Sequence, residues 1–483
     1  GSNPVGATST EAQVADLGLC RRPEQEPDVS DALVTDLYEV TMAMTYRRLG
    51  MAGPATFSLF VRDLPPDRGF LVAAGLESAL DFLTGLHVDD EDVADLADAL
   101  KRSPADLEPL HGLRFTGDVW AVPEGRVVLP GEPLLEVTAP LPEAQLVETY
   151  VLNQVSHQTA LASKAARSVI AATGRPVVDF GLRRCQGVEA GMHAARAAAI
   201  VGFASTSNVA AALRYGLPAT GTMAHSFVEV FPDEARAFRA FAAGGTDPVT
   251  LLVDTYETGH GLEVAAEVLR EVTDGRGRGV RLDSGDLAAL ATDARRTLDA
   301  AGLTSARVVV SGGLDEFAVA ELVAAGAPVD VFAVGTRVAT SADAPYLDAA
   351  YKLVEYDGRP VMKLSTGKVT APGAKQVHRR EGGGEDVLAT RTEPVPPDYE
   401  VLLQPVMRAG RRTGVAGTPA SAVAEARERF ARDLAVLPED ARRIRSPVAS
   451  RPRTSARLVE LTTEVVRALR QPGPPADGPA PSA

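Results

Sequence analysis

The segment PATGTMAHSFVEVF, residues 218–231, shows the pattern from which we infer the fold of the chain. A short apolar and glycine-rich run ends at His225, and Ser226, Phe227 and Glu229 come soon after it. Six other segments of the middle third end in the same way, with polar or glycine residues at the C-terminal edge. We interpret these segments as parallel strands of an α/β barrel whose chemistry lies on one rim. For His225 alone, a turn histidine with a structural role is the alternative.

The strand candidates alternate with alanine-rich stretches of helical character. They are VVDFG from residue 177, AIVGFAST from 199, PATGTMA from 218, VTLLVDTYET from 249, GVRLDSGD from 279, ARVVVSGG from 306 and DVFAVGT from 330. Strands and helices alternating at this spacing predict βαβ units in a parallel sheet, and so many units favour closure into a barrel. Functional side chains are expected at the carboxyl ends of the strands.

The segments on both sides of this pattern predict a second domain of mixed α and β structure. The predicted division is a disordered segment at 1–28, an N-terminal α+β domain at 29–145, a catalytic α/β barrel at 146–343, a C-terminal segment packing on the N-terminal domain at 344–470, and a disordered tail at 471–483. Local signals predict a hairpin turning at Asp357-Gly358 and helices over Glu143–Ala172, from Pro419 with Thr418 as its cap, and over Ser455–Leu469.

The composition limits the possible partners. The 483 residues include 49 Lys and Arg against 64 Asp and Glu, a formal net charge of −15. This balance argues against a nucleic-acid surface, which needs a basic footprint. No apolar run approaches the roughly 18 to 20 residues that span a bilayer, and the N-terminal stretch lacks the features of a secretory signal. Cys20 and Cys185 suggest neither a disulfide framework nor a metal site, so a cytoplasmic protein is expected.

Two late strand ends have the character of a phosphate cradle. SGGLDE at 311–316 and VGTR at 334–337 place small residues where backbone N–H groups can approach an anion. In α/β barrels a phosphate site commonly lies on the last two strands. Two such turns in succession favour a phosphorylated ligand, and ordinary tight turns are the alternative.

Charged and aromatic residues gather at two other strand ends. In VRLDSGD, Arg281 and Asp283 share one face of an extended strand, with Ser284 beside them. The arginine suits an anion and the aspartate suits ribose hydroxyls or Mg²⁺, whereas a structural ion pair is the alternative. In DFGLRR, the aromatic Phe180 lies near Arg183, a bidentate anion-binding group.

Taken together, these motifs resemble the nicotinate phosphoribosyltransferases. The blocks that carry the resemblance, in an order and spacing similar to the family's from Asp31 to Arg379, are TDLYEVTMA, DFGLRR, GTMAHSF, VRLDSGD, SGGLDE and KLSTGKVTAPGAKQVHR. The resemblance implies an irregular α/β barrel of the type II phosphoribosyltransferase kind, packed against a domain built from the N- and C-terminal segments. It also implies an enzyme of NAD biosynthesis that forms nicotinate mononucleotide and pyrophosphate from nicotinate and phosphoribosyl pyrophosphate, with Mg²⁺ and coupled ATP hydrolysis.

The resemblance also implies a role for individual residues. His225 matches the histidine that the family phosphorylates from ATP. Phe180 and Tyr38 resemble the aromatic pair that sandwiches the pyridine ring, with Tyr38 supplied by a neighbouring subunit of a homodimer that shares its active sites. On the sequence alone, a core aromatic is the alternative for Tyr38.

The remaining roles concern the sugar and the anionic groups. Asp283 is the candidate for the ribose side and, with Arg281 and His225, for a catalytic role. Further candidates for substrate contact are Gly312, Gly313, Gly335 and Thr336 at the 5′-phosphate, Arg183 and Arg281 at a carboxylate or phosphate, and Asp254 and Ser284 at neighbouring strand ends.

One position bears on the choice of substrate. Ser207 stands where the related nicotinamide-using enzymes place an aspartate, which would accept a hydrogen bond from an amide but repel the carboxylate of nicotinate. The serine therefore predicts a preference for the acid. The alternatives are a nicotinamide or quinolinate phosphoribosyltransferase, or a non-catalytic nucleotide-binding paralogue that would be expected to lose His225 or Asp283.

Overall fold

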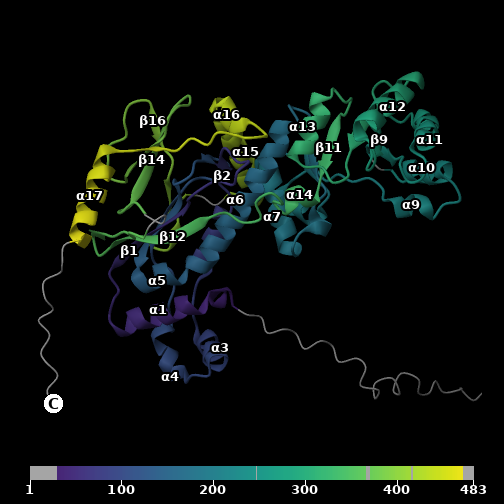
Figure 1. Ribbon diagram of the computed structural model, residues 1–483. Coiled ribbons are helices and arrows are strands. Elements are labelled where there is room, and N and C mark those ends of the chain that lie inside the picture. The colour runs from purple at the N-terminus through teal and green to yellow at the C-terminus, as the bar shows by residue number, and fades with distance from the viewer. Residues whose placement is uncertain (1–29, 246, 366–369, 415–416, 471–483) are drawn as a thin grey trace, which may run out of the picture.

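The computed structural model describes residues 30–245, 247–365, 370–414 and 417–470. The segments predicted to be disordered, 1–28 and 471–483, lie outside the described residues. Figure 1 shows an elongated molecule in which the parallel strands β9 and β11 lie at one end and helices α1 and α17 at the other. In the described part of the chain, no helix combines the length and apolar character needed to cross a membrane.

The largest sheet is built from both ends of the chain. Its order is β13-β12-β1-β5-β3-β17-β18, with antiparallel pairing throughout. The strands are β1 (Pro54–Val61), β3 (Asp118–Ala121), β5 (Pro133–Pro140), β12 (Ala349–Tyr356), β13 (Arg359–Pro360), β17 (Gln404–Arg408) and β18 (Arg411–Arg412). Because β1 lies between β5 and β12, the segments before and after the barrel share one sheet. The limits of the domains given above stay predictions.

Smaller sheets and helices surround this sheet. The strands are β2 (Leu71–Val72) with β4 (Val127–Val128), and β16 (Tyr399–Val401), β14 (Lys375–Arg380), β15 (Val387–Thr390) and β19 (Arg453–Thr454) in that order. The helices are η1 (Asp31–Leu33), α1 (Leu37–Arg48), α2 (Leu76–Gly85), α3 (Asp90–Leu100), α4 (Pro104–Leu107), η2 (Glu108–Leu110), α5 (Leu141–Leu146), α15 (Pro419–Val436), α16 (Glu439–Arg442) and α17 (Ala456–Arg470).

Several local predictions are confirmed. The hairpin β12–β13 turns at Asp357 and Gly358, whose φ angles of 49° and 69° suit a tight hairpin turn with two left-handed residues. The Oγ1 of Thr418 accepts a hydrogen bond from the backbone N–H of Ser421 and caps α15. The predicted helices near 143–172 and 455–469 are present as α5 with α6 and as α17.

The second large sheet is parallel. Its order is β7-β6-β11-β10-β9-β8. The strands are β6 (Val177–Asp179), β7 (Ser205–Thr206), β8 (Val249–Leu252), β9 (Arg278–Leu282), β10 (Arg307–Val310) and β11 (Val331–Val334). The connecting helices are α6 (Glu148–Ala171), η3 (Leu182–Arg184), α7 (Val188–Ile200), α8 (Val209–Tyr215), α9 (His225–Glu229), α10 (Glu234–Ala243), α11 (Thr258–Glu271), α12 (Leu287–Ala300), α13 (Glu316–Ala324) and α14 (Thr336–Ala339).

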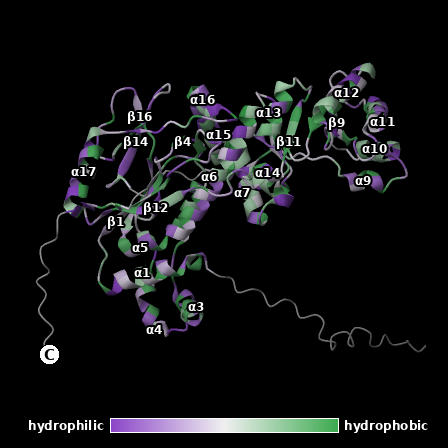
Figure 2. Cartoon of the chain, viewed as in Figure 1, coloured by the Kyte–Doolittle hydropathy of each residue, from purple (hydrophilic) through white to green (hydrophobic). Residues whose placement is uncertain are grey.

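The core of this half explains why the strands form. Strands β8, β10 and β11 are apolar over most of their length, as expected for parallel strands covered on both faces. Figure 2 shows β11 in the colour of hydrophobic residues. Alanines on α7, α11 and α12 allow close packing onto the sheet. The predicted fold class, an irregular α/β barrel with a second α+β domain, is confirmed, and the parallel sheet is curled into a half-barrel.

The predicted closure of the barrel is wrong, because β7 and β8 are the two edges of an open half-barrel. The segment 218–224 is no strand: only Met223 is buried there, and a single bridge joins Ala219 to Thr206. The expected strand from residue 199 is reduced to β7, because the alanine-rich α7 continues through Ile200 and is followed by Gly202, whose φ is 101°.

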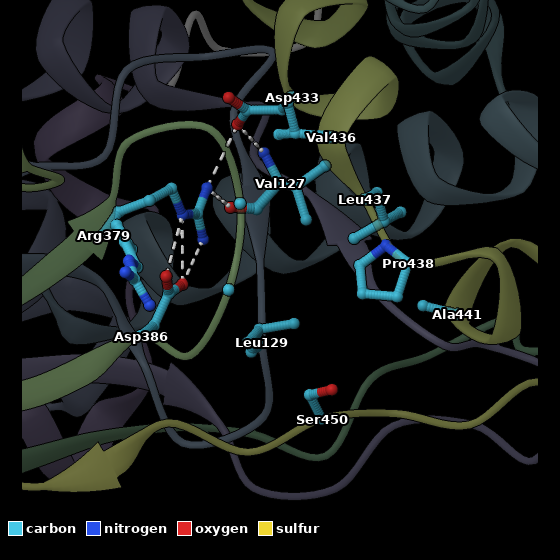
Figure 3. A pocket seen from close by; sticks show the side chains of 13 residues that line it. Val127, Leu129, Arg379, Asp386, Asp433, Val436, Leu437, Pro438, Ala441 and Ser450 are labelled. Carbon is cyan, nitrogen blue, oxygen red and sulfur yellow. Dashed lines mark hydrogen bonds and ion pairs between the residues drawn. The ribbon is translucent and has the colours of Figure 1, made fainter.

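Charged side chains join the C-terminal segment to the N-terminal half. Arg379 on β14 pairs with Asp386 at 2.7 Å and with Asp433 on α15 at 3.1 Å, and Arg126 also reaches Asp433, at 2.9 Å. Figure 3 shows the contacts of Arg379 with Asp386 and Asp433 beside a small hollow of about 60 Å³ lined mainly by apolar side chains. A space of this volume holds only a few water molecules. The hollow therefore belongs to the contact between the C-terminal segment and the N-terminal half, and it is not a candidate substrate site.

The same contact between the C-terminal segment and the N-terminal half makes the stability of the fold sensitive to substitution of Gly69. A Cβ at Gly69 would lie 2.2 Å from the carbonyl oxygen of Ala441 on α16. We expect Gly69→Ala to lower the free energy of unfolding by about 1–3 kcal/mol, the usual cost of overpacking. Gly85, the last residue of α2, has no atom within 4 Å of an added Cβ, so Gly85→Ala is the matched control. Denaturant unfolding of both variants measures the difference, and equal stabilities would contradict the packing argument.

Candidate active site

The side chain of Arg281 connects several strand ends at the carboxyl edge of the parallel sheet. Its Nε donates a hydrogen bond to Ser311 Oγ at 2.8 Å, and its Nη1 donates to Thr222 Oγ1 at 2.8 Å and to the carbonyl oxygen of Met223 at 3.2 Å. Its Nη2 contacts Asp283 Oδ1 at 2.6 Å. Arg281 is buried, so its position is fixed by these partners.

Asp283 follows β9 on the same face as Arg281. Burial raises the pKa of its carboxyl, but the hydrogen bonds from Ser311 (2.5 Å) and Arg281 outweigh burial and hold the pKa below its usual range. About a third of the side chain remains exposed. Asp283 is therefore an ionised carboxylate that is oriented by its neighbours and still accessible to a ligand.

Asp254 lies behind Asp283, after β8. Its Oδ2 accepts hydrogen bonds from the backbone N–H of Asp283 at 2.8 Å and from Ser284 Oγ at 2.9 Å. Its Oδ1 is buried and has no hydrogen-bond partner among the described residues. A buried carboxylate oxygen without a donor is costly, and a bound cation or hydroxyl group would satisfy it.

Phe180 forms an apolar surface beside these polar groups. Its ring follows β6, and the guanidinium carbon of Arg281 lies 5.4 Å from the ring centroid. Beneath the ring is a small apolar cluster on the inner face of the sheet, made of Val178, Val309, Val331 and Ala333. An aromatic ligand bearing an anionic group matches this combination of an apolar wall and a cation.

The turn that carries Phe180 is organised by Asp179. Its Oδ1 accepts a hydrogen bond from the backbone N–H of Gly181 at 2.8 Å, and its Oδ2 accepts one from Thr206 Oγ1 at 2.7 Å. Burial raises the pKa of Asp179, and these hydrogen bonds oppose that rise. The backbone N–H of Ser207 donates to the carbonyl oxygen of Asp179 at 2.8 Å, so Ser207 lies beside the turn that bears Phe180.

The two glycine turns lie on the same edge. Gly312 has a φ of 93°, and a Cβ there would lie 1.7 Å from the carbonyl oxygen of Asp283. Gly313 has a φ of 66° and no atom within 4 Å of an added Cβ, so its backbone faces open space. A Cβ at Gly335 would lie 3.0 Å from the carbonyl oxygen of Phe180, and Thr336 after it is exposed. Both turns thus present backbone beside Asp283 and Phe180.

His225 lies at the same edge but not at a strand end as predicted. It is the first residue of α9, because the segment before it forms a loop. Its Nδ1 is 3.2 Å from Thr255 Oγ1, which follows Asp254. His225 is near enough to Asp283 to be one of the groups that lower the pKa of that carboxyl, after Ser311 and Arg281.

Two candidates are placed differently. Tyr38 lies on α1, half exposed, and Figure 1 shows α1 well away from β9 at the other end of the molecule. One chain alone does not bring Tyr38 to the site. Arg183 lies beside Phe180 in η3, where it is exposed and has no hydrogen-bond or ion-pair partner within the described ranges.

Sequence analysis missed some of the residues that organise the site. Ser311 and Thr222 hold Arg281, Asp179 holds the turn of Phe180, and Thr255 contacts His225. Each stands within a segment that the sequence singled out, so nearness to a strand end was the available signal. Their partners come from other strands, and only the folded chain shows those pairings.

The arrangement favours binding of a phosphorylated sugar next to an aromatic anion. An ionised carboxylate, a buried arginine, an apolar ring and two open glycine turns share one edge of the sheet. Within the residues that the structure describes, no three His, Cys, Asp or Glu side chains group as a metal site. A divalent cation here would therefore depend on oxygen ligands from the substrate as well.

Comparisons with known proteins extend these observations. Residues 33–156 match the family model for the nicotinate phosphoribosyltransferase N-terminal domain, and residues 176–377 match the model for the nicotinate phosphoribosyltransferase family. Nicotinate phosphoribosyltransferase pncB2 of Mycobacterium tuberculosis is 50% identical over 386 residues, covering 79% of this chain and 82% of its own. The Bacillus subtilis nicotinate phosphoribosyltransferase is 45% identical over 73% of this chain and 74% of its own.

Solved structures give the same picture. The crystal structure of human nicotinic acid phosphoribosyltransferase superposes with a TM-score of 0.77 at 32% identity, over 90% of this chain and all of the other. A structure described as nicotinate-nucleotide pyrophosphorylase from Pyrococcus furiosus gives a TM-score of 0.70 at 25% identity, over 86% and 99% of the two chains.

Proposed function

The chain belongs to the nicotinate phosphoribosyltransferase family, and we propose that it joins nicotinate to phosphoribosyl pyrophosphate with coupled ATP hydrolysis through His225. The products are nicotinate mononucleotide and pyrophosphate, which places the reaction in NAD biosynthesis. The observation that carries the proposal is the gathering of Phe180, Arg281, Asp283 and the two glycine turns on one edge of the sheet.

The pyridine ring of nicotinate stacks on Phe180, above the apolar cluster on the inner face of the sheet. Arg183, which has no partner in the described chain, and Arg281 are the cations available to the carboxylate of nicotinate or to phosphate. Ser207 adds no charge beside the ring, so it does not repel a carboxylate. These contacts hold the ring nitrogen toward the sugar.

The phosphoribosyl group lies along the two glycine turns. The open backbone at Gly312, Gly313, Gly335 and Thr336 suits the 5′-phosphate, because N–H groups without side chains can approach its oxygens. Asp283 is ionised and accessible, which suits the ribose hydroxyls. Ser284 and Asp254 continue the polar surface at the neighbouring strand end.

Mg²⁺ fits this edge. Asp283 and the unpartnered Oδ1 of Asp254 are hard oxygen ligands, and pyrophosphate oxygens would complete the coordination, as is usual for magnesium with phosphate substrates. When bound, Mg²⁺ neutralises negative charge on the pyrophosphate group.

In the transfer, the bond between C1 of the ribose and the pyrophosphate oxygen breaks as the bond from the nicotinate nitrogen to C1 forms. The sugar gains oxocarbenium character, so the chain's main tasks are alignment of the nitrogen and electrostatic stabilisation. Phe180 orients the ring, Asp283 faces the developing positive charge, and the arginines stabilise the departing anion. No covalent bond between enzyme and sugar is needed.

His225 is the proposed site of phosphorylation. An imidazole nitrogen attacks the γ-phosphorus of ATP, ADP leaves, and the phosphohistidine is hydrolysed in a later step of turnover. The contact with Thr255 holds the ring at the edge of the site, and its partial exposure leaves it accessible to a nucleotide. The added phosphoryl group would lie near Asp283, which links ATP use to the phosphoribosyl side of the site.

The active site is completed by a second copy of the chain in a homodimer. Tyr38 is half exposed on α1, beside exposed Val34 and Leu37, and this apolar surface suits contact with another subunit. Tyr38 of the partner subunit would cover the face of the pyridine ring opposite Phe180. The exposed position of Tyr38, away from its own site, supports this arrangement.

We expect γ-labelled ATP to label the wild-type chain and to leave a His225→Ala variant unlabelled, with loss of the ATP stimulation of turnover. Binding of nicotinate should change little, because His225 does not contact the ring in this scheme. His260→Ala is the matched control, since His260 is an exposed histidine on the nearby helix α11. Undiminished labelling of the His225→Ala variant would remove the histidine from its proposed role.

Substrate choice is tested at Ser207. We expect Ser207→Asp to lower kcat/KM for nicotinate by about 100-fold, since like charges in a desolvated site cost several kcal/mol. Turnover of nicotinamide should rise in the same variant, and Ser207→Ala should leave the preference for nicotinate intact. Product assays with nicotinate, nicotinamide and quinolinate in parallel, each with and without ATP, measure the change. Intact nicotinate turnover with undetectable nicotinamide turnover would be inconsistent with this account of selectivity.

Shared active sites predict complementation. Tyr38→Ala and Arg281→Ala subunits are each expected to be nearly inactive, whereas their mixed dimers contain one intact site. Random mixing should restore about a quarter of wild-type activity, because half of the dimers are mixed and each has one working site of two. Mixtures of Phe180→Ala with Arg281→Ala are the control, since both residues belong to the same subunit's half of the site. No recovery in the first mixture would place Tyr38 outside the site.

A further inference from the structure

A buried lysine lies behind both glycine turns. Lys164 on α6 is 1% exposed, and its Nζ is 2.6 Å from Glu316 Oε2 and 2.9 Å from Asp343 Oδ1. Glu316 is the first residue of α13, three positions after Gly313, and Asp343 follows α14, which begins directly after Gly335. One ammonium group therefore contacts the segments that follow both turns.

Each of these carboxylates already has an arginine. Arg167 Nε is 2.9 Å from Glu316 Oε1, and Arg68 donates to both oxygens of Asp343 at 3.1 Å. The network thus contains the three cations Arg68, Lys164 and Arg167 against the two carboxylates Glu316 and Asp343. Lys164 is the surplus positive charge, and the pKa of Asp343 is held well below its usual range despite burial.

A surplus buried cation is unfavourable for folding alone. Moving an ammonium ion out of water is costly, and buried ion pairs recover that cost only when charges balance and hydrogen bonds are complete. An anion bound in front of the network would restore the balance. The glycine turns, whose backbone faces open space at Gly313, are the place in front of Lys164 where an anion is proposed to bind.

The two turns are also joined directly. Asp315 caps α13 by accepting hydrogen bonds from Phe317 and Ala318, and it pairs with Arg337 of α14 at 2.8 Å. This pair is balanced and partly exposed, so it links the turns without adding charge. Helix α6 packs against both α13 and α14, which makes Lys164 the buried anchor common to them.

We propose that Lys164 is a positioning residue for phosphoribosyl pyrophosphate, holding both phosphate turns in register and balancing the charge of the 5′-phosphate from behind. The inference rests on the proposed function, in which these turns bind that phosphate. Lys164 acts through α13 and α14 and does not touch the substrate. Arg68 comes from the loop before β2, so the N-terminal half contributes to the same network.

Substitution of Lys164 separates this role from a structural one. Lys164→Met removes the charge and leaves two balanced ion pairs, so the chain is expected to fold. We expect the KM for phosphoribosyl pyrophosphate and the Kd for ribose 5-phosphate to rise about tenfold, because a charge inside the protein acts on the phosphate without touching it, while the KM for nicotinate changes little. Lys164→Gln, which keeps a donor for both carboxylates, covers the case in which the methionine variant does not fold.

Lys375 provides a matched control. It is 2% exposed, lies 3.2 Å from Glu136, and that carboxylate also keeps an arginine, Arg391, when the lysine is removed. Its place on β14 is remote from the glycine turns. Lys375→Met is expected to change thermal stability to an extent similar to Lys164→Met but to leave the KM for phosphoribosyl pyrophosphate and the Kd for ribose 5-phosphate unchanged.

Three outcomes are possible, and each supports or overturns the proposed role of Lys164. A loss of ribose 5-phosphate affinity in Lys164→Met but not in Lys375→Met supports the proposal. Unchanged phosphate affinity in both variants, whatever the change in stability, overturns the role of Lys164 while leaving the proposed function intact. If wild-type protein shows no binding of ribose 5-phosphate, as measured by calorimetry and thermal shift, the phosphate assignment fails and the inference fails with it.

Discussion

The guanidinium of Arg281 is the group on which the candidate active site depends. A buried guanidinium has five N–H donors and cannot lose its charge, so every acceptor around it is constrained. Here those acceptors come from β9, from the turn after β10 and from the loop before α9. Because the N–H groups of Arg281 need acceptors, this one side chain fixes three separate segments relative to Phe180. It also orients the carboxylate of Asp283.

The parallel pairing of the strands allows Arg281 to contact several segments at once. In β6 and β8–β11 the carboxyl ends meet at one edge, so residues far apart in sequence become neighbours. On one face of this sheet the buried side chains Val178, Val309, Val331 and Ala333 form a small apolar cluster, and the ring of Phe180 packs against it at the carboxyl edge. An aromatic ring beside a polar edge suits a ring-shaped ligand that carries a charge.

The sequence predicted what depends on local pattern. Continuous apolar runs identified β8, β10 and β11, and turn chemistry identified the hairpin at Asp357 and the cap at Thr418. The prediction of a strand failed where burial determines the structure. The segment 218–224 has strand-like residues, but only Met223 is buried, and no apolar face holds the segment in a sheet. The hydrogen-bond partners of Arg281 could not be predicted from the sequence either, since nothing in the spacing of Thr222 and Ser311 shows that both accept from one arginine. Tyr38 is a different case, because its proposed ring contact requires a second chain.

The overall charge of −15 opposes the binding of anionic substrates, so the charges near the site are the ones that matter for the proposed function. Surface carboxylates far from the site are screened, because the Debye length at physiological ionic strength is about 8 Å. Charges inside the fold are screened much less, so their balance near the site matters more than the total. Two cations lie close to the glycine turns: Arg183 has no partner within the described chain, and Lys164 adds a positive charge beyond those that pair with Glu316 and Asp343. An anionic protein can thus attract a phosphorylated sugar at one edge while the rest of its surface favours solubility.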